Sequence, residues 1–419
     1  MLKNQRFELW FRKDTDMNTQ EKRNILGITS SRMISRIGDI MFDFANNTFL
    51  ASINPTSLSL VAIYQSLESV IGVLFNLFGG VIADNFKRKK IIIGTNILCG
   101  LACIVLSFIS QQQWLVYAIV ITNVILAFMS TFSGPSYKAF TKEIVKKDSI
   151  SQLNSLLETT STIIKVTIPM VAIFLYKLLG IHGVLLLDGL SFLIAALLIF
   201  FIVPINEKVI TKEKMTISGV FNDLKIGFKY VYNHKQIFII IVLSALVNFF
   251  LAAYNLLLPY SNQMFSEVSA NLYGTFLTAE AIGGFIGAIC SGFINKSLSS
   301  KWLMLFLALS GLMLMLATPL YFMFHHVIVL ALSPALFSLF LSIFNIQFFS
   351  IVQRDVDNEF LGRVFGIIFT VAILFMPIGI GFFSVVLNPH NTFNLFIVGG
   401  CISLLALLGG FLLKKWALY

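Results

Sequence analysis

Charged residues are scarce in this chain. Asp, Glu, Lys and Arg make up 12% of its 419 residues, whereas a water-soluble globular protein carries about 25%. Hydrophobic residues reach 57%, and the mean hydropathy is +0.86. A soluble globule could not cover so much apolar surface with so few charges, so lipid must surround most of it. This shortage of charge predicts an integral membrane protein.

Cysteine is also rare, and it occurs only within apolar runs. The four cysteines are Cys99, Cys103, Cys290 and Cys401. Their positions favour small packing residues over a disulfide framework or a zinc site. The chain also lacks the HExxH, GxSxG and P-loop patterns that mark common enzymes. We therefore expect neither an enzyme, nor a cofactor, nor a resident metal.

The formal net charge of +10 arises from basic residues that are spread over short stretches between apolar runs. Of the 30 Lys and Arg residues, all but Arg32, Arg36, Lys165 and Lys177 fall on one side of a twelve-helix topology. Short cytoplasmic loops retain Lys and Arg, so both termini are predicted to be cytoplasmic. Such charges orient the protein and meet anionic lipid headgroups, and no nucleic-acid partner is expected. The mixed-charge start of the chain is typical of a cytoplasmic tail rather than a cleaved signal peptide.

Twelve apolar runs are long enough to cross about 30 Å of hydrocarbon as helices. They lie near 25–50, 57–83, 90–110, 114–137, 151–178, 182–204, 236–260, 270–294, 301–323, 327–352, 361–386 and 391–413. The predicted fold class is thus an all-α integral membrane protein with twelve transmembrane helices in two six-helix pseudo-repeats. The predicted parts are a tail 1–24, a first half 25–204, a basic loop 205–235, a second half 236–413 and a tail 414–419.

The two halves share a degraded repeat. LESVIGVLFNLFGGVIADNFKRKK, around the second run, aligns with AEAIGGFIGAICSGFINKSLSSKW, around the eighth. The alignment sets Asp84 against Asn295 at an offset of 211, and Glu68 against Glu280 at 212. Parallel six-helix repeats joined by a loop are typical of transporters whose substrate site lies between the halves.

The repeat also carries a specific motif, GGVIADNFKRKKII. It resembles the cytoplasmic signature between helices two and three of the major facilitator superfamily. SSRMISRIGDIMF and VQRDVDNEFLGRVFGIIF are similar to its drug and siderophore exporter branch, which includes macrolide-efflux and enterobactin-exporter proteins. Two departures are Lys87, in place of a second glycine, and Ile168-Pro169, in place of the Gly-Pro associated with antiporters.

The resemblance also implies a conformational latch at this motif. Asp84 would meet the amino end of the eleventh helix, near Arg363, because a helix amino terminus carries partial positive charge. The latch candidates are Gly80, Asp84, Arg88, Lys89 and Arg363.

The first apolar run carries four charges along one helical stripe: Arg32, Arg36, Asp39 and Asp43. Each charge near the membrane centre costs about 2.5–3.5 kcal/mol, so the stripe must face the bundle interior. Two interpretations stay open. One is a structural ion-pair ladder that includes Arg36 and Asp39, and the other is a cavity-lining group that exchanges protons.

Four further charged residues are candidates for coupling or binding: Glu68, Glu280, Glu158 and Lys165. Glu68 and Glu280 are single carboxylates among apolar residues, so burial favours their neutral forms. Either could carry a coupling proton or contact a cationic substrate, or serve only in packing. Glu158 and Lys165 lie on one helix face but are too far apart to pair directly. Asp188 is expected near the outer surface, as a cap or a partner of Lys177.

Together these features predict a secondary active exporter of a hydrophobic or amphipathic small molecule, driven by protons through alternating access. A cavity wall containing Phe42, Phe44, Phe249 or Phe250 would suit such a solute better than a sugar. Uptake of a metabolite, movement of a lipid, and a non-transporting receptor or assembly factor are the alternatives. The protein is expected to act as a monomer in a bacterial plasma membrane.

Overall fold

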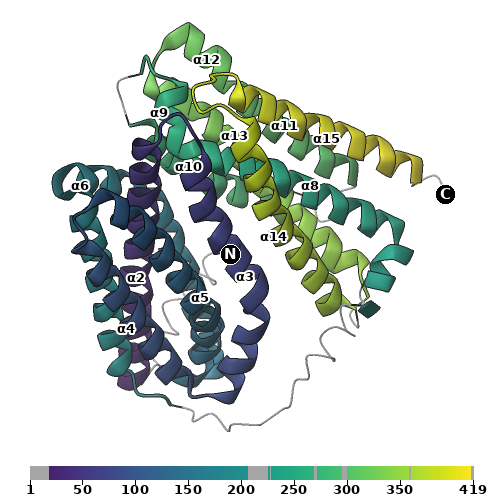
Figure 1. Cartoon of the computed structure of the whole chain (residues 1–419). Coiled ribbons are helices and arrows are strands. Elements are labelled where there is room, and N and C mark those ends of the chain that lie inside the picture. The colour runs from purple at the N-terminus through teal and green to yellow at the C-terminus, as the bar shows by residue number, and fades with distance from the viewer. Residues whose placement is uncertain are drawn as a thin grey trace, which may run out of the picture.

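The computed structural model consists of long helices (Figure 1). It describes residues 18–205, 225–226, 228–268, 271–294, 300–357 and 360–416, and these contain no β-strand. Two helical bundles follow one another along the chain.

The first bundle is built around the long helix α6. Its members are α2 (Thr19–Ile53), α3 (Ser59–Asn85), α4 (Arg88–Ser107), α5 (Gln112–Ile144), the short η2 (Lys147–Ser149) and α6 (Ile150–Phe200). Helix α6 packs along both α2 and α4, while α3 packs on α5. Helix α2 therefore lies against protein over much of its length, as its charged stripe requires.

The second bundle contains three close helix pairs. Its members are α8 (Lys235–Leu257), η3 (Leu258–Tyr260), α9 (Ser261–Met264), α10 (Leu272–Phe293), α11 (Ser300–Met315), α12 (Ala317–Phe324), α13 (Val327–Asp355), α14 (Leu361–Val386) and α15 (Asn394–Trp416). Helix α10 packs on α13, α11 on α15, and α8 on α14.

Eight helical segments in the described part of the chain are long and apolar enough to cross a membrane. Helix α2 is not among them, because its charges interrupt the apolar run that such a segment needs. Two shorter apolar segments occur at Ser59–Phe75 and Leu374–Val386. These lengths and compositions define a protein that crosses the membrane several times.

Helix α6 covers two of the predicted apolar runs. Its backbone leaves the helical conformation at Gly180, where φ is 65° and ψ is −171°. An L-residue with a side chain rarely adopts this positive φ, so glycine is suited to the break. The predicted boundary between runs five and six coincides with this residue.

Glycines allow α10 and α13 to approach closely. A Cβ atom added at Gly283 would collide with the backbone of Ala335, and one at Gly287 with the backbone of Leu339. Small residues at helix contacts are the usual packing device in lipid. Gly283 and Gly287 therefore let the backbones of the two helices pack directly against each other.

The two bundles meet at one end and diverge toward the other (Figure 1). At the end where they meet, the Tyr260 hydroxyl donates a hydrogen bond to the Ser57 carbonyl at 2.9 Å. The rings of Phe44 and Tyr273 stack across the boundary, with centroids 5.0 Å apart. These contacts close the molecule beside η3.

Candidate functional site

A cavity of about 890 Å³ lies between the two bundles. Three predicted carboxylates from three helices line it: Asp43 on α2, Glu68 on α3 and Glu280 on α10. Much of the remaining wall is apolar or aromatic, with Ile40, Phe44, Tyr64, Pro169, Leu258, Tyr273, Leu277, Phe285, Leu341, Ile346, Met376 and Ile380. We call this space the central cavity. Its size and mixed lining are those of a small-molecule site.

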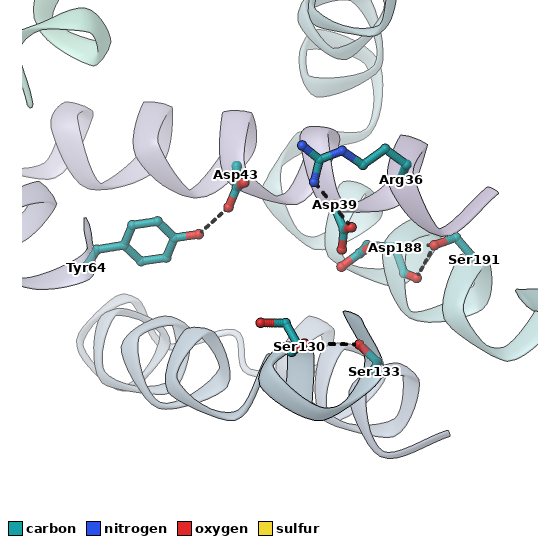
Figure 2. Close-up of polar contacts among 8 residues, drawn as sticks. All are labelled: Arg36, Asp39, Asp43, Tyr64, Ser130, Ser133, Asp188 and Ser191. Carbon is teal, nitrogen blue, oxygen red and sulfur yellow. Dashed lines mark hydrogen bonds and ion pairs between the residues drawn. The ribbon is translucent and has the colours of Figure 1, made fainter. Parts of the chain in front are cut away.

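Asp43 belongs to a polar network at one end of the central cavity. The Tyr64 hydroxyl donates a hydrogen bond to the Asp43 carboxylate at 3.0 Å, and the Asn47 amide donates to the Asp43 carbonyl at 2.8 Å. The Gln65 amide then donates to Asn47 at 3.1 Å and to the carbonyl of Asn255, in the second bundle, at 3.4 Å. This network links the wall of the cavity to the boundary between the bundles, and Figure 2 shows its contact between Tyr64 and Asp43.

The other two acids are held differently. Glu280 accepts a hydrogen bond from the hydroxyl of Tyr254 at 3.3 Å. Tyr254 is buried, and its ring packs 4.9 Å from that of Phe337. Glu68 is exposed to the central cavity and has no hydrogen bond or ion pair with a described residue. Glu68 is therefore the acid most available to a solute.

A second cavity of about 380 Å³ lies within the first bundle, and we call it the N-half cavity. Helices α2, α4, α5 and α6 form its wall. The predicted residues Arg32, Asp39 and Glu158 line this space and not the central cavity. The structure thus divides the charged stripe of α2 between two compartments, because Asp39 and Asp43 are a full helical turn apart.

Arg36 and Lys165 line both cavities. Arg36 forms the predicted ion pair with Asp39, with Nη1 and Oδ2 3.8 Å apart (Figure 2). Lys165 forms no ion pair within 4.0 Å with any described residue, and neither does Glu158. Glu158 and Lys165 therefore remain separate on α6, as their spacing predicts.

Asp188 does not lie near the outer surface, where the sequence analysis predicted it. It is completely buried, accepts a hydrogen bond from the Cys103 thiol at 3.3 Å, and lies beside the Ser191 hydroxyl at 3.4 Å. A Cβ atom added at Gly38 of α2 would collide with its carboxyl group. The expectation of a surface cap paired with Lys177 was wrong. Helical rise carries Asp188 about 12 Å from the break at Gly180, next to the charged stripe (Figure 2).

The latch candidates are only partly within the described residues. The surroundings of Gly80 and the side chains of Asp84 and Arg363 lie outside them. Arg88 forms an ion pair with Glu143 at 2.8 Å, and Lys89 donates to the carbonyls of Phe200 and Ile202, each at 2.8 Å. These two basic residues therefore connect α4 to the ends of α5 and α6.

Of the aromatic residues predicted to line a cavity, only Phe44 is among the wall residues. Phe42 is buried in the core, with 1% of its surface exposed. Phe249 and Phe250 pack against Phe383, at centroid distances of 4.9 and 5.7 Å. Tyr64, Tyr273 and Phe285 provide the rest of the aromatic surface, and hydropathy alone gave no signal to distinguish them.

Two helical bundles around a cavity lined by carboxylates from three separate helices define a polytopic membrane transporter fold. The chain belongs to the Major Facilitator Superfamily, whose sequence profile matches residues 28–380. It is accordingly a multi-pass protein of the cell membrane.

Relatives of known name include exporters. Macrolide efflux protein A of Streptococcus pyogenes is 24% identical over 334 residues, which cover 76% of this chain and 79% of that protein. The putative bacilysin exporter BacE of Bacillus subtilis (strain 168) is 25% identical over 332 residues, or 76% and 78% of the two chains. The inward-facing crystal structure of a bacterial homologue of the iron transporter ferroportin superposes with a TM-score of 0.73 at 18% identity. That match covers 96% of this chain and 99% of the other.

Proposed function

We propose that this protein is a secondary active exporter of a hydrophobic or amphipathic small molecule, of drug, macrolide or siderophore-like character. The observation that carries the proposal is the central cavity. Its volume of about 890 Å³ suits a drug-sized solute. Its apolar wall with three separate carboxylates suits a solute that combines an apolar body with a polar or cationic group.

The proposed topology has twelve transmembrane helices in two halves and both termini in the cytoplasm. It counts α6 as two crossings divided at Gly180, and α11 with α12 as one. The concentration of Lys and Arg on one side supports the orientation. In that orientation, the contacts beside η3 close the outer side and the bundles diverge toward the cytoplasm.

Transport would proceed by alternating access, with the two halves rocking about the central cavity. Proton exchange is the proposed driving force, so that the protein acts as an antiporter and confers antibiotic resistance when its substrate is an antibiotic. The proposed coupling acids are Glu68 and Glu280, with Asp43 beside them. The isolation of Glu68 from described basic partners supports this assignment.

Other activities use the same fold. Uptake of a metabolite and movement of a lipid would need the same cavity but the opposite direction or an opening to lipid. A receptor or assembly factor could dispense with the carboxylates that line the cavity here. The names of the exporting relatives favour export among these activities.

Everted membrane vesicles from cells that express the protein test this function directly. Energised vesicles should accumulate at least one compound from a labelled panel of macrolides, cationic dyes, siderophores and peptides. An uncoupler that collapses the pH gradient should stop accumulation, whereas vanadate should not. Accumulation that continues without the gradient would contradict proton coupling, and no accumulation of any panel member would contradict export.

A further inference from the structure

The N-half cavity is polar although it lies inside an apolar bundle. Its wall includes the hydroxyl residues Ser130 and Ser133 of α5 and Ser161 of α6. Its volume of about 380 Å³ exceeds the roughly 30 Å³ that one liquid water occupies more than tenfold. The space can therefore receive a solute group as well as water.

Two cations in the wall of this cavity form no ion pair with the part of the chain that the structure describes. Arg32 and Lys165 have no carboxylate within 4.0 Å among the described residues, whereas Arg36 pairs with Asp39. Glu158 is the remaining acid in the wall, so the cavity carries an excess of positive charge. A cation in surroundings of low dielectric constant attracts an anion strongly, and an anionic group is therefore the complementary occupant.

Arg32 is held in place by an aromatic support. Its guanidinium lies over the ring of Tyr137, with Cζ 4.6 Å from the ring centroid. Tyr137 is buried, and its hydroxyl is bonded to Ser31 at 3.2 Å and to the Asn96 amide at 3.1 Å. A guanidinium fixed in this way is preorganised to donate a bidentate pair of hydrogen bonds to a carboxylate.

The two cavities meet at shared residues. Arg36 on α2 and Lys165 on α6 line both spaces. A solute whose body lies in the central cavity would reach Arg32 by extending one end between these two side chains. Such a solute would reach from the apolar wall of the central cavity to the cationic wall of the N-half cavity.

We propose that the N-half cavity is a second binding compartment that takes the carboxylate of an amphipathic solute whose apolar body lies in the central cavity. The proposal rests on the proposed function and specifies the class of substrate. Arg32 and Lys165 contact the carboxylate, and nearby hydroxyl groups complete its hydrogen bonds.

A matched pair of fluorescent probes tests the compartment in purified full-length protein. N-dansyl-phenylalanine and its methyl ester share one apolar body and differ only in the free carboxylate. Wild type should bind the acid about tenfold more tightly than the ester, the effect of one charge-assisted contact. Arg32→Gln and Lys165→Gln should each bring the two affinities to within about threefold. Arg23→Gln and Lys177→Gln change exposed residues of the same helices that line neither cavity, and they should keep the preference.

Equal binding of acid and ester by wild type would overturn the proposal, as would binding of neither. Survival of the acid preference in both Arg32→Gln and Lys165→Gln would also overturn it. If Arg32→Gln fails to fold, Lys165→Gln alone decides, because Lys165 is exposed to the cavities and its side chain is not required for packing. Export of a cationic dye by vesicles in any of these cases would leave the proposed function intact. Conversely, an acid preference in a protein that exports nothing would contradict the exporter assignment while supporting the compartment.

Discussion

The hydroxyl of Tyr64 on α3 donates a hydrogen bond to the Asp43 carboxylate on α2, with 3.0 Å between the oxygens. Tyr64 is almost fully buried, whereas Asp43 faces the central cavity. The contact therefore links the packing of two helices to the orientation of one acid in the site.

Removal of the Tyr64 hydroxyl should slow transport, because it frees the Asp43 carboxylate from its fixed orientation. Tyr64→Phe is expected to lower the transport rate at equal expression about tenfold or more, because a hydrogen bond to a charged group contributes about 1.5–3 kcal/mol. The double variant Tyr64→Phe/Asp43→Asn should be no slower than Asp43→Asn alone. Additive losses in vesicle transport assays would show that the two residues act independently.

Glu68 and Glu280 of the central cavity should control the pH dependence of transport. Glu68→Gln and Glu280→Gln each remove a titratable group without a change of shape, so the rate should vary less with pH in either variant. Asp39→Asn should instead lower the yield of folded protein, because it leaves Arg36 without its partner within a helix that crosses the membrane, where a lone charge is costly. Transport rates across a pH series and the yield from size-exclusion chromatography measure these effects. Unchanged results for all three variants would make the acids packing residues.

The close approach of α10 and α13 should not tolerate a methyl group. Gly283→Ala places a Cβ against the Ala335 backbone, so it should destabilise the protein by about 1–3 kcal/mol. Gly292→Ala on the same helix meets no atom within 4 Å and should be neutral or stabilising by up to about 1 kcal/mol. Thermal unfolding of the detergent-purified proteins gives both values. Equal melting temperatures for the two variants would refute the backbone contact.

The ion pair between Arg88 and Glu143 should matter for stability. Its side chains are 13% and 12% exposed, and Glu143→Gln leaves a poorly hydrated cation, at a cost of about 3 kcal/mol. The pair of Arg354 and Asp355 is 47% and 37% exposed, so Asp355→Asn should cost less than about 1 kcal/mol. A larger drop in melting temperature for Asp355→Asn than for Glu143→Gln would contradict this ranking.

The latch assigned to Asp84 predicts a defect in turnover. Asp84→Asn should slow transport more than it weakens substrate binding, because the carboxylate would act on closure of the cytoplasmic side rather than in the cavity. Asn295→Asp, at the equivalent place in the second half, should be tolerated. Rates and affinities at equal expression distinguish the two effects, and a wild-type rate for Asp84→Asn would remove the latch assignment.

The sequence was sufficient to identify the fold class and several of the acids that line the central cavity. A charged stripe on one helix cannot face lipid, so Asp43 had to turn toward protein or water. Glu68 and Glu280 likewise stood out as single charges in apolar runs. The helix break at Gly180 agreed with the predicted boundary between runs five and six, because both are determined by the short segment of sequence around this residue.

The sequence could not tell which residues share a compartment. Asp39 and Asp43 lie on one stripe, yet packing of α2 against α5 and α6 encloses Asp39 in the N-half cavity and leaves Asp43 to the central cavity. Asp188 was misplaced because hydropathy locates a span but not the neighbours that surround each of its turns.

Hydropathy and charge asymmetry are properties of local sequence. Each apolar run must suit the lipid, and each loop the water, independently of the other segments. The resemblance to a membrane transporter family followed from these properties, from one cytoplasmic motif and from short stretches in the first and eleventh apolar runs. The support of Arg32 by Tyr137, and the meeting of two cavities at Arg36 and Lys165, depend on helices that are distant in sequence. Only tertiary packing decides such contacts, because the rotation and depth of each helix are set by the side chains of its neighbours.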